Sequence, residues 1–212
     1  MSISFSCSML KKGICLLIFV LSVIPVKSQK AGVNSKHVKV LFIGNSLTYY
    51  NNLPELVKGK ALQKDIRLDV DMIAYPNYAL IDHWEDGKAQ KMIKQEKYDF
   101  VLIQQGPSSQ PYGREVLFDY GRRFKSLCDT YGGQLIFLMV WPSQNHYSTF
   151  DAVIKNHEDA VRTINAGICP VGKVWKKHFD STNDYSYYGQ DGFHPSLKGS
   201  QVAAEIIVSC LF

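Results

Sequence analysis

The sequence has few of the residues that would indicate a metal centre or a disulfide scaffold. Five cysteines occur in 212 residues, none of them in a Cys-x-x-Cys pair, and two of them lie before residue 28. The other three, Cys128, Cys169 and Cys210, are widely spaced and allow one disulfide at most, so we expect buried free thiols. We predict no metal site and no cofactor.

Clusters of lysine and arginine are also missing from the main part of the chain. The formal net charge is +5, but residues 1–28 contain three lysines and no acidic residue, so the charge without them is +2. No basic patch remains that would attract nucleic acid or an anionic membrane surface. We therefore expect neither as a partner.

The longest apolar run lies near the N-terminus and is too short to cross a bilayer. Lys11 and Lys12 precede the uncharged segment 13–26, and Val26-Lys27-Ser28 at its end offers small residues at the positions that a signal peptidase reads. A membrane-spanning helix needs about 20 apolar residues. Residues 1–28 are therefore predicted to be a cleaved secretory signal and residues 29–37 a polar linker, which implies a secreted or periplasmic protein without membrane attachment.

After residue 37, short apolar runs alternate with longer amphipathic segments, which is typical of a parallel sheet built from β-α units. A hydrophobic content of 46% suits one domain over residues 38–212. Expected strands are 38–43, 66–73, 98–103, 134–140 and 167–171, and expected helices are 52–63, 88–95, 115–130, 150–165 and 197–208. This pattern predicts a flavodoxin-like three-layer α/β/α sandwich with a five-stranded parallel sheet, and segment 74–86 is expected to be a long loop.

A serine and a histidine are expected to meet at the carboxyl edge of this sheet. Ser46 follows the apolar run that ends at Ile43, and ligands of open α/β sheets bind at that edge. His194 comes just before the last helix, and Asp191 lies three residues before it, where its carboxylate can orient the imidazole. Ser46 can also be read as a turn serine, and the Asp191–His194 pair as a surface loop that caps the last helix.

These motifs in combination resemble the SGNH/GDSL-like hydrolases, which are serine esterases on a flavodoxin-like sandwich. Residues 44–48, Gly-Asn-Ser-Leu-Thr, are similar to the first block of that family, and residues 191–195, Asp-Gly-Phe-His-Pro, are similar to its last block. Further segments at 104–108, 141–142, 170–172 and 194–196 resemble a branch of secreted members. The resemblance implies Ser46 as nucleophile, His194 as general base and Asp191 as the residue that orients it.

The oxyanion hole departs from the family pattern. The family supplies a glycine N–H and an asparagine side chain, but no glycine occurs between Gly59 and Gly87. Asn77 N–H is the expected replacement for the glycine, because asparagine tolerates left-handed backbone angles, and it is expected to act together with Ser46 N–H. For the missing asparagine we favour the side chain of Gln104 over that of Gln105, with Ser108 as a third choice.

Several polar aromatic side chains lie in loops at the same edge. Trp141, His146 and Tyr188 are weak candidates for holding a sugar ring. His157 lies on an apolar helix face and is predicted to be a core residue. For His83 we favour packing over substrate contact.

The predicted function is that of a secreted serine esterase that removes a small acyl group, most simply O-acetyl, from a carbohydrate. One alternative is a glycan-binding protein that kept the fold and lost turnover, which the altered oxyanion residues would explain. Another is a lipase or thioesterase of the same fold. The polar loops at the sheet edge favour a small polar substrate over these lipid-like ones.

Overall fold

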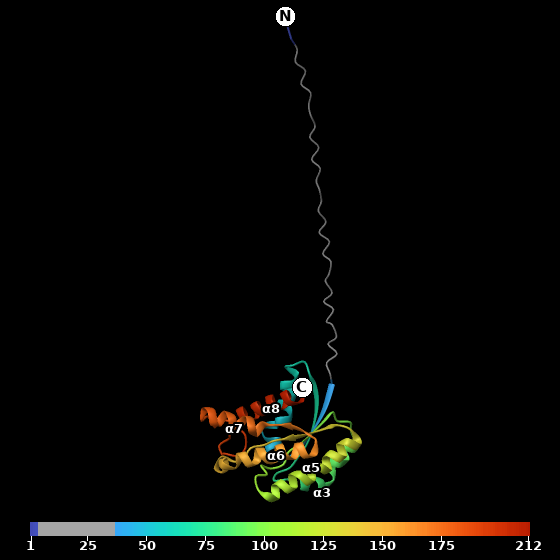
Figure 1. Cartoon of the computed structure of the whole chain (residues 1–212). Helices are drawn as coiled ribbons and strands as arrows, with labels where there is room; N and C mark the ends of the chain where they lie inside the picture. Colours follow the sequence, from blue (N-terminus) through green and yellow to red (C-terminus); the bar gives the residue numbers. More distant parts are fainter. Residues whose placement is uncertain (4–36) are drawn as a thin grey trace. The chain divides into compact units, whose positions relative to one another are not determined.

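The computed structural model describes residues 1–3 and 37–212, and the domain lies in the second range (Figure 1). The predicted signal peptide 1–28 and linker 29–37 lie almost entirely outside the described residues. Within the part of the chain that is described, no helix has the length and apolar character needed to span a membrane.

Five parallel strands form one sheet in the order β2-β1-β3-β4-β5. This is the order expected for a flavodoxin-like sheet, and it confirms the predicted architecture. The strands are β1 (His37–Gly44), β2 (Arg67–Ala74), β3 (Phe100–Ile103), β4 (Gln134–Leu138) and β5 (Gly167–Cys169). β1 lies between two neighbours and is buried almost throughout, because its apolar run packs against helices on both faces.

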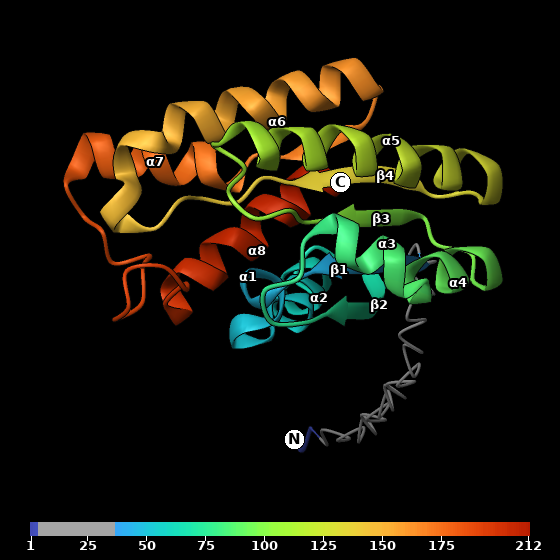
Figure 2. The same cartoon turned by 90° about the horizontal axis from the view of Figure 1, so that it is seen from below.

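Helices cover both faces of the sheet, and Figure 2 shows α5 and α6 on the side opposite α8. α2 (Leu53–Leu62), α7 (Val171–Thr182) and α8 (Leu197–Leu211) contribute to one hydrophobic core. The opposite core contains residues of α3 (Leu80–Asp86), α4 (Lys88–Gln95), α5 (Pro111–Tyr131) and α6 (Phe150–Ile164). Short helical segments complete the fold: α1 (Ser46–Tyr49), η1 (Tyr50–Asn52) and η2 (Gln144–Thr149).

The helix boundaries follow local sequence signals. Pro54 and Pro111 lie in the first turns of α2 and α5, where a missing N–H costs nothing. The Ser196 hydroxyl accepts a hydrogen bond from Gly199 N and caps α8. Asn165 and Asn183 end α6 and α7 in the left-handed conformation.

Two helices were not expected from the sequence. Segment 74–86, predicted to be a loop, contains α3, whose first turn is stabilised by a hydrogen bond from Ala79 N to the Asp82 carboxylate. α7 was also missed, although Val171, Trp175 and Phe179 recur at helical spacing and are all buried. Gly172 lets α7 approach the sheet, because a Cβ there would overlap the Val140 carbonyl oxygen.

Candidate active site

The predicted nucleophile lies at the first position of a short helix that starts where β1 ends. The Asn45 side chain caps this helix, with Oδ1 accepting from Leu47 N at 3.1 Å. Its Nδ2 donates to the Tyr78 carbonyl at 3.0 Å and so links the loop after β1 to the loop after β2. Ser46 is partly exposed, whereas its neighbours Asn45 and Leu47 are buried. The loop is therefore fixed by the residues on both sides of the serine.

Gln104 supports this loop from below and is only 1% exposed. Its Oε1 accepts from Asn45 N at 2.8 Å and from the Thr48 hydroxyl at 2.9 Å. Its Nε2 donates to the Gln105 carbonyl at 2.8 Å. The structure therefore gives Gln104 a supporting position beneath the nucleophile, in place of the position in the oxyanion hole that we expected for it.

Gln105 has a side-chain N–H donor that the described residues do not use. Its Oε1 accepts from Leu80 N at 2.8 Å, and because a backbone N–H can only donate, the amide orientation is fixed. Nε2 then points away from Leu80 and forms no hydrogen bond within residues 37–212. This contact also attaches Gln105 to the segment that carries Asn77.

Asn77 adopts the backbone conformation that the sequence predicts. Its φ of +61° lies in the left-handed region, in a turn closed by a hydrogen bond from Tyr78 N to the Tyr75 carbonyl at 3.3 Å. The residue is exposed, and neither its N–H nor that of Ser46 makes a hydrogen bond to residues in the range 37–212. Both N–H groups are thus free to bind a ligand at the carboxyl edge of the sheet.

The predicted acid–base pair is formed in the loop before α8. His194 Nδ1 donates to Asp191 Oδ2 at 2.6 Å, and Asp191 Oδ1 accepts from the N–H groups of Phe193 and His194 at 2.9 Å. The hydrogen bond from the imidazole is the main cause that holds the pKa of the Asp191 carboxyl below its usual range. This arrangement leaves His194 Nε2 available for proton transfer.

Tyr50 and Asn51 connect the segment after the nucleophile to the loop that carries Asp191 and His194, called the histidine loop below. The sequence did not indicate either residue. The Tyr50 ring stacks on the His194 imidazole, with centroids 4.6 Å apart and planes 18° apart. Asn51 Nδ2 donates to the Pro195 carbonyl and to the Ser200 hydroxyl, both at 3.0 Å. Asn51 and Asn52 both have left-handed φ angles, of +52° and +54°. The paired asparagines before Pro54 were the available signal for such a turn.

Two of the three predicted sugar contacts are buried and support the histidine loop from inside. Trp141 is 2% exposed, stacks on Trp175, and donates from Nε1 to the Phe193 carbonyl at 3.0 Å. The Tyr188 hydroxyl donates to the Pro142 carbonyl at 2.8 Å. Neither offers a ring face to a substrate, because loop packing covers both. His146 is exposed, as expected.

Two further histidines, His157 and His83, are buried, as are two of the three cysteines that were expected to be buried free thiols. His157 is fully buried, which confirms its prediction as a core residue. His83 donates from Nε2 to the Gly44 carbonyl at 2.7 Å, directly under the nucleophile loop, and burial lowers its pKa. Cys128 and Cys169 are free and buried, whereas Cys210 is free and exposed. Over the described residues, no group of His, Cys, Asp and Glu side chains is arranged to bind a metal.

Solved structures with a similar architecture include proteins described as SGNH hydrolases and esterases. A protein described as an SGNH hydrolase from Slackia heliotrinireducens has a TM-score of 0.71 and 19% identity, over 84% of this chain and 100% of that one. A DUF4886 family protein from Bacteroides uniformis has a TM-score of 0.69 and 16% identity, over 83% of each chain. A catalytic mutant of Axe2, an acetylxylan esterase from Geobacillus stearothermophilus, has a TM-score of 0.61 and 16% identity, over 81% of this chain and 93% of that one.

These similarities define the class of the fold, which is the three-layer sandwich of the SGNH hydrolases. They agree with the fold that the resemblance implied. No protein-family model matches the sequence, and a comparison with curated proteins finds no match either.

Proposed function

We propose that this protein is a serine esterase that hydrolyses a small acyl ester, an O-acetyl group on a carbohydrate. The observation that carries the proposal is the 2.6 Å pair of His194 and Asp191, stacked on the residue that follows the nucleophile helix. This contact joins the loop that carries His194 to the segment that follows the partly exposed Ser46, and it supports His194 as the base for that serine. The carbohydrate is suggested by the acetyl-xylooligosaccharide esterase among the similar structures.

The reaction is a double displacement at the ester carbonyl. His194 Nε2 removes the Ser46 proton as Oγ attacks, and the imidazolium then protonates the leaving alcohol. Asp191 keeps the ring in the tautomer that this transfer requires. Water, deprotonated by the same histidine, releases the acyl group and regenerates the serine.

Three donors are proposed for the oxyanion. Two are the free N–H groups of Ser46 and Asn77, and the third is Gln105 Nε2, which takes the role we first assigned to Gln104. The Gln105 amide is buried, and its Oε1 is held by Leu80 N–H. Such an amide suits this task, because its Nε2 does not have to move as charge develops on the oxyanion. Loss of one such donor costs about 10²- to 10³-fold in kcat.

Residues 1–28 favour export of the protein as a signal-bearing precursor, so we propose that the esterase acts outside the cytoplasm. A substrate in that compartment would be an extracellular or periplasmic polysaccharide. Detection of an N-terminus near residue 29 in secreted material would support this localisation, and retention of residues 1–28 would contradict it.

The test is hydrolysis of 4-nitrophenyl acetate and acetylated xylotriose by wild type, Ser46→Ala and His194→Ala. We expect either variant to lose about 10⁴-fold or more in kcat. Asn145→Ala, an exposed change on a neighbouring loop, serves as the matched control. Equal rates in wild type and both variants, with retained glycan binding, would instead identify a non-catalytic glycan-binding protein.

A further inference from the structure

A cavity of about 330 Å³ lies at the carboxyl edge of the sheet, beside the loop that carries His194. Its walls come from the loop after β3, the loop after β4 and the histidine loop: Pro107, Ser109, Gln110, Pro142, Ser143, His146, Thr149 and Phe193. The Phe193 ring also contacts the His194 imidazole, with centroids 5.2 Å apart. Phe193 therefore borders both the cavity and the proposed general base.

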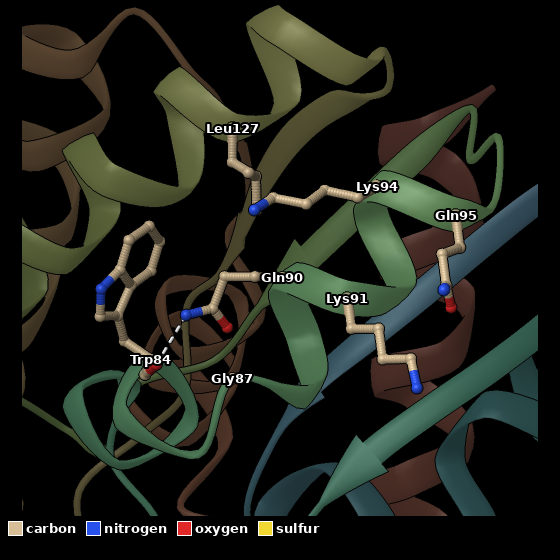
Figure 3. A pocket seen from close by; sticks show the side chains of 7 residues that line it. All are labelled: Trp84, Gly87, Gln90, Lys91, Lys94, Gln95 and Leu127. Atoms are coloured by element: carbon tan, nitrogen blue, oxygen red, sulfur yellow. Dashed lines mark hydrogen bonds between the residues drawn. The ribbon is translucent and has the colours of Figure 1, made fainter.

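The walls of this cavity contain no charged residue. Four further cavities in the described part of the chain are each lined by at least two lysines. The largest, of about 590 Å³, lies between α3, α4 and α5 (Figure 3), where Lys91 and Lys94 accompany a Gln90 amide that donates to the Trp84 carbonyl. None of these four includes a residue of the histidine loop. Of these five cavities, the one beside Phe193 is suited to a neutral ligand of the proposed site.

We propose that this cavity binds a neutral sugar ring on the alcohol side of the scissile ester, an inference that rests on the proposed esterase function. Its volume is near the lower end of the range for ligand sites, about 300–1,000 Å³. Phe193, Pro107 and Pro142 supply apolar surface for the C–H face of a sugar ring. The other five lining residues carry hydroxyl, amide or imidazole groups, which an acyl chain could not satisfy.

His146 and Gln110 are the side chains best placed to recognise sugar hydroxyls. The His146 ring is held by the Ser143 hydroxyl, 2.9 Å from Nδ1, and its carbonyl accepts from the Thr149 hydroxyl at 2.8 Å. Its Nε2 forms no hydrogen bond within residues 37–212. The exposed Gln110 amide likewise forms none among these residues. A hydroxyl-bearing ligand would satisfy both groups at once.

The experiment compares His146→Ala, Gln110→Ala and the control Asn145→Ala, whose side chain is exposed on the same segment as His146 and does not line the cavity. We measure kcat/KM for acetylated xylotriose, 4-nitrophenyl acetate and 4-nitrophenyl octanoate. Each cavity variant is expected to lower the ratio of the xylotriose value to the 4-nitrophenyl acetate value by about 3- to 10-fold, mainly through KM. The control is expected to keep the wild-type ratio.

Two results would overturn the proposal. One is an unchanged ratio in both cavity variants, and the other is a selective loss on octanoate, which would make the cavity an acyl site. If wild type hydrolyses none of the three esters, the esterase proposal fails and the cavity is tested by binding alone. Unacetylated xylotriose should then perturb the NMR signals of residues around the cavity, and do so more weakly in His146→Ala. No perturbation, or equal perturbation in both proteins, contradicts a sugar site.

Discussion

The nucleophile side and the histidine side of the candidate site are held in place by different kinds of contact. Below Ser46, the buried Gln104 amide makes three hydrogen bonds, and the buried His83 imidazole donates to the Gly44 carbonyl. On the other side, the Asp191 and His194 side chains are 50% and 26% exposed. Buried hydrogen bonds are costly to break, whereas exposed ion pairs contribute little to stability. Changes at the buried residues below Ser46 should therefore lower the stability of the protein, whereas changes at the exposed side chains of the histidine side should mainly reduce activity.

The largest effect on stability is expected from Gln104→Leu. This change leaves two buried donors, Asn45 N–H and the Thr48 hydroxyl, without an acceptor. At about 1–3 kcal/mol for each unsatisfied group, the free energy of unfolding should fall by about 4 kcal/mol. Guanidinium denaturation measures it, with Gln63→Leu on the exposed end of α2 as the control. A loss below about 1 kcal/mol would show that the nucleophile loop does not depend on these hydrogen bonds.

A somewhat smaller effect is expected from acid, through His157. Burial lowers the pKa of this imidazole to about 4, and its Nε2 has no hydrogen-bond partner among the described residues. The unfolded chain takes up a proton near pH 6.5, whereas the folded chain does so only near pH 4. Stability should therefore be greatest above pH 6.5 and fall by about 3 kcal/mol as the pH drops to about 4.

The measurement is the free energy of unfolding at several pH values between 4 and 8, for wild type and His157→Leu. The variant should lose most of the pH dependence in this range. His83, whose pKa is shifted in the same direction, should account for part of what remains. A variant that retains the full wild-type slope would assign the acid sensitivity to other groups.

The parts of the fold and site that could be predicted from the sequence depend on local patterns. The strand that ends at Gly44 is a continuous apolar run, and the Asp191–His194 pair is formed within one turn, so neither needs tertiary information. The left-handed angle at Asn77 follows from the tolerance of asparagine for it. In each case the sequence neighbours set the geometry.

The parts that could not be predicted depend on how loops pack against one another. Gln104 and Gln105 follow β3 and point to opposite faces, and the sequence does not show which face meets the nucleophile loop. Trp141 and Tyr188 have the polar tips of rim residues, but both form hydrogen bonds with loop carbonyls inside the protein. Contacts between segments that are distant in the sequence determine where these four side chains lie.

Tyr50→Leu is expected to have the smallest effect on stability. This variant also tests the contrast between the two sides most directly. Tyr50 is 41% exposed, so loss of its ring should change the free energy of unfolding little. Without the stacked ring, the imidazole of His194 is less well fixed, and kcat for 4-nitrophenyl acetate should fall about 3- to 10-fold while KM stays the same. Tyr50→Phe keeps the ring and should restore kcat. If Tyr50→Phe is as slow as Tyr50→Leu, the hydroxyl matters and not the stacking. If the free energy of unfolding of Tyr50→Leu is lower by several kcal/mol, the histidine side contributes to stability as much as the nucleophile side does.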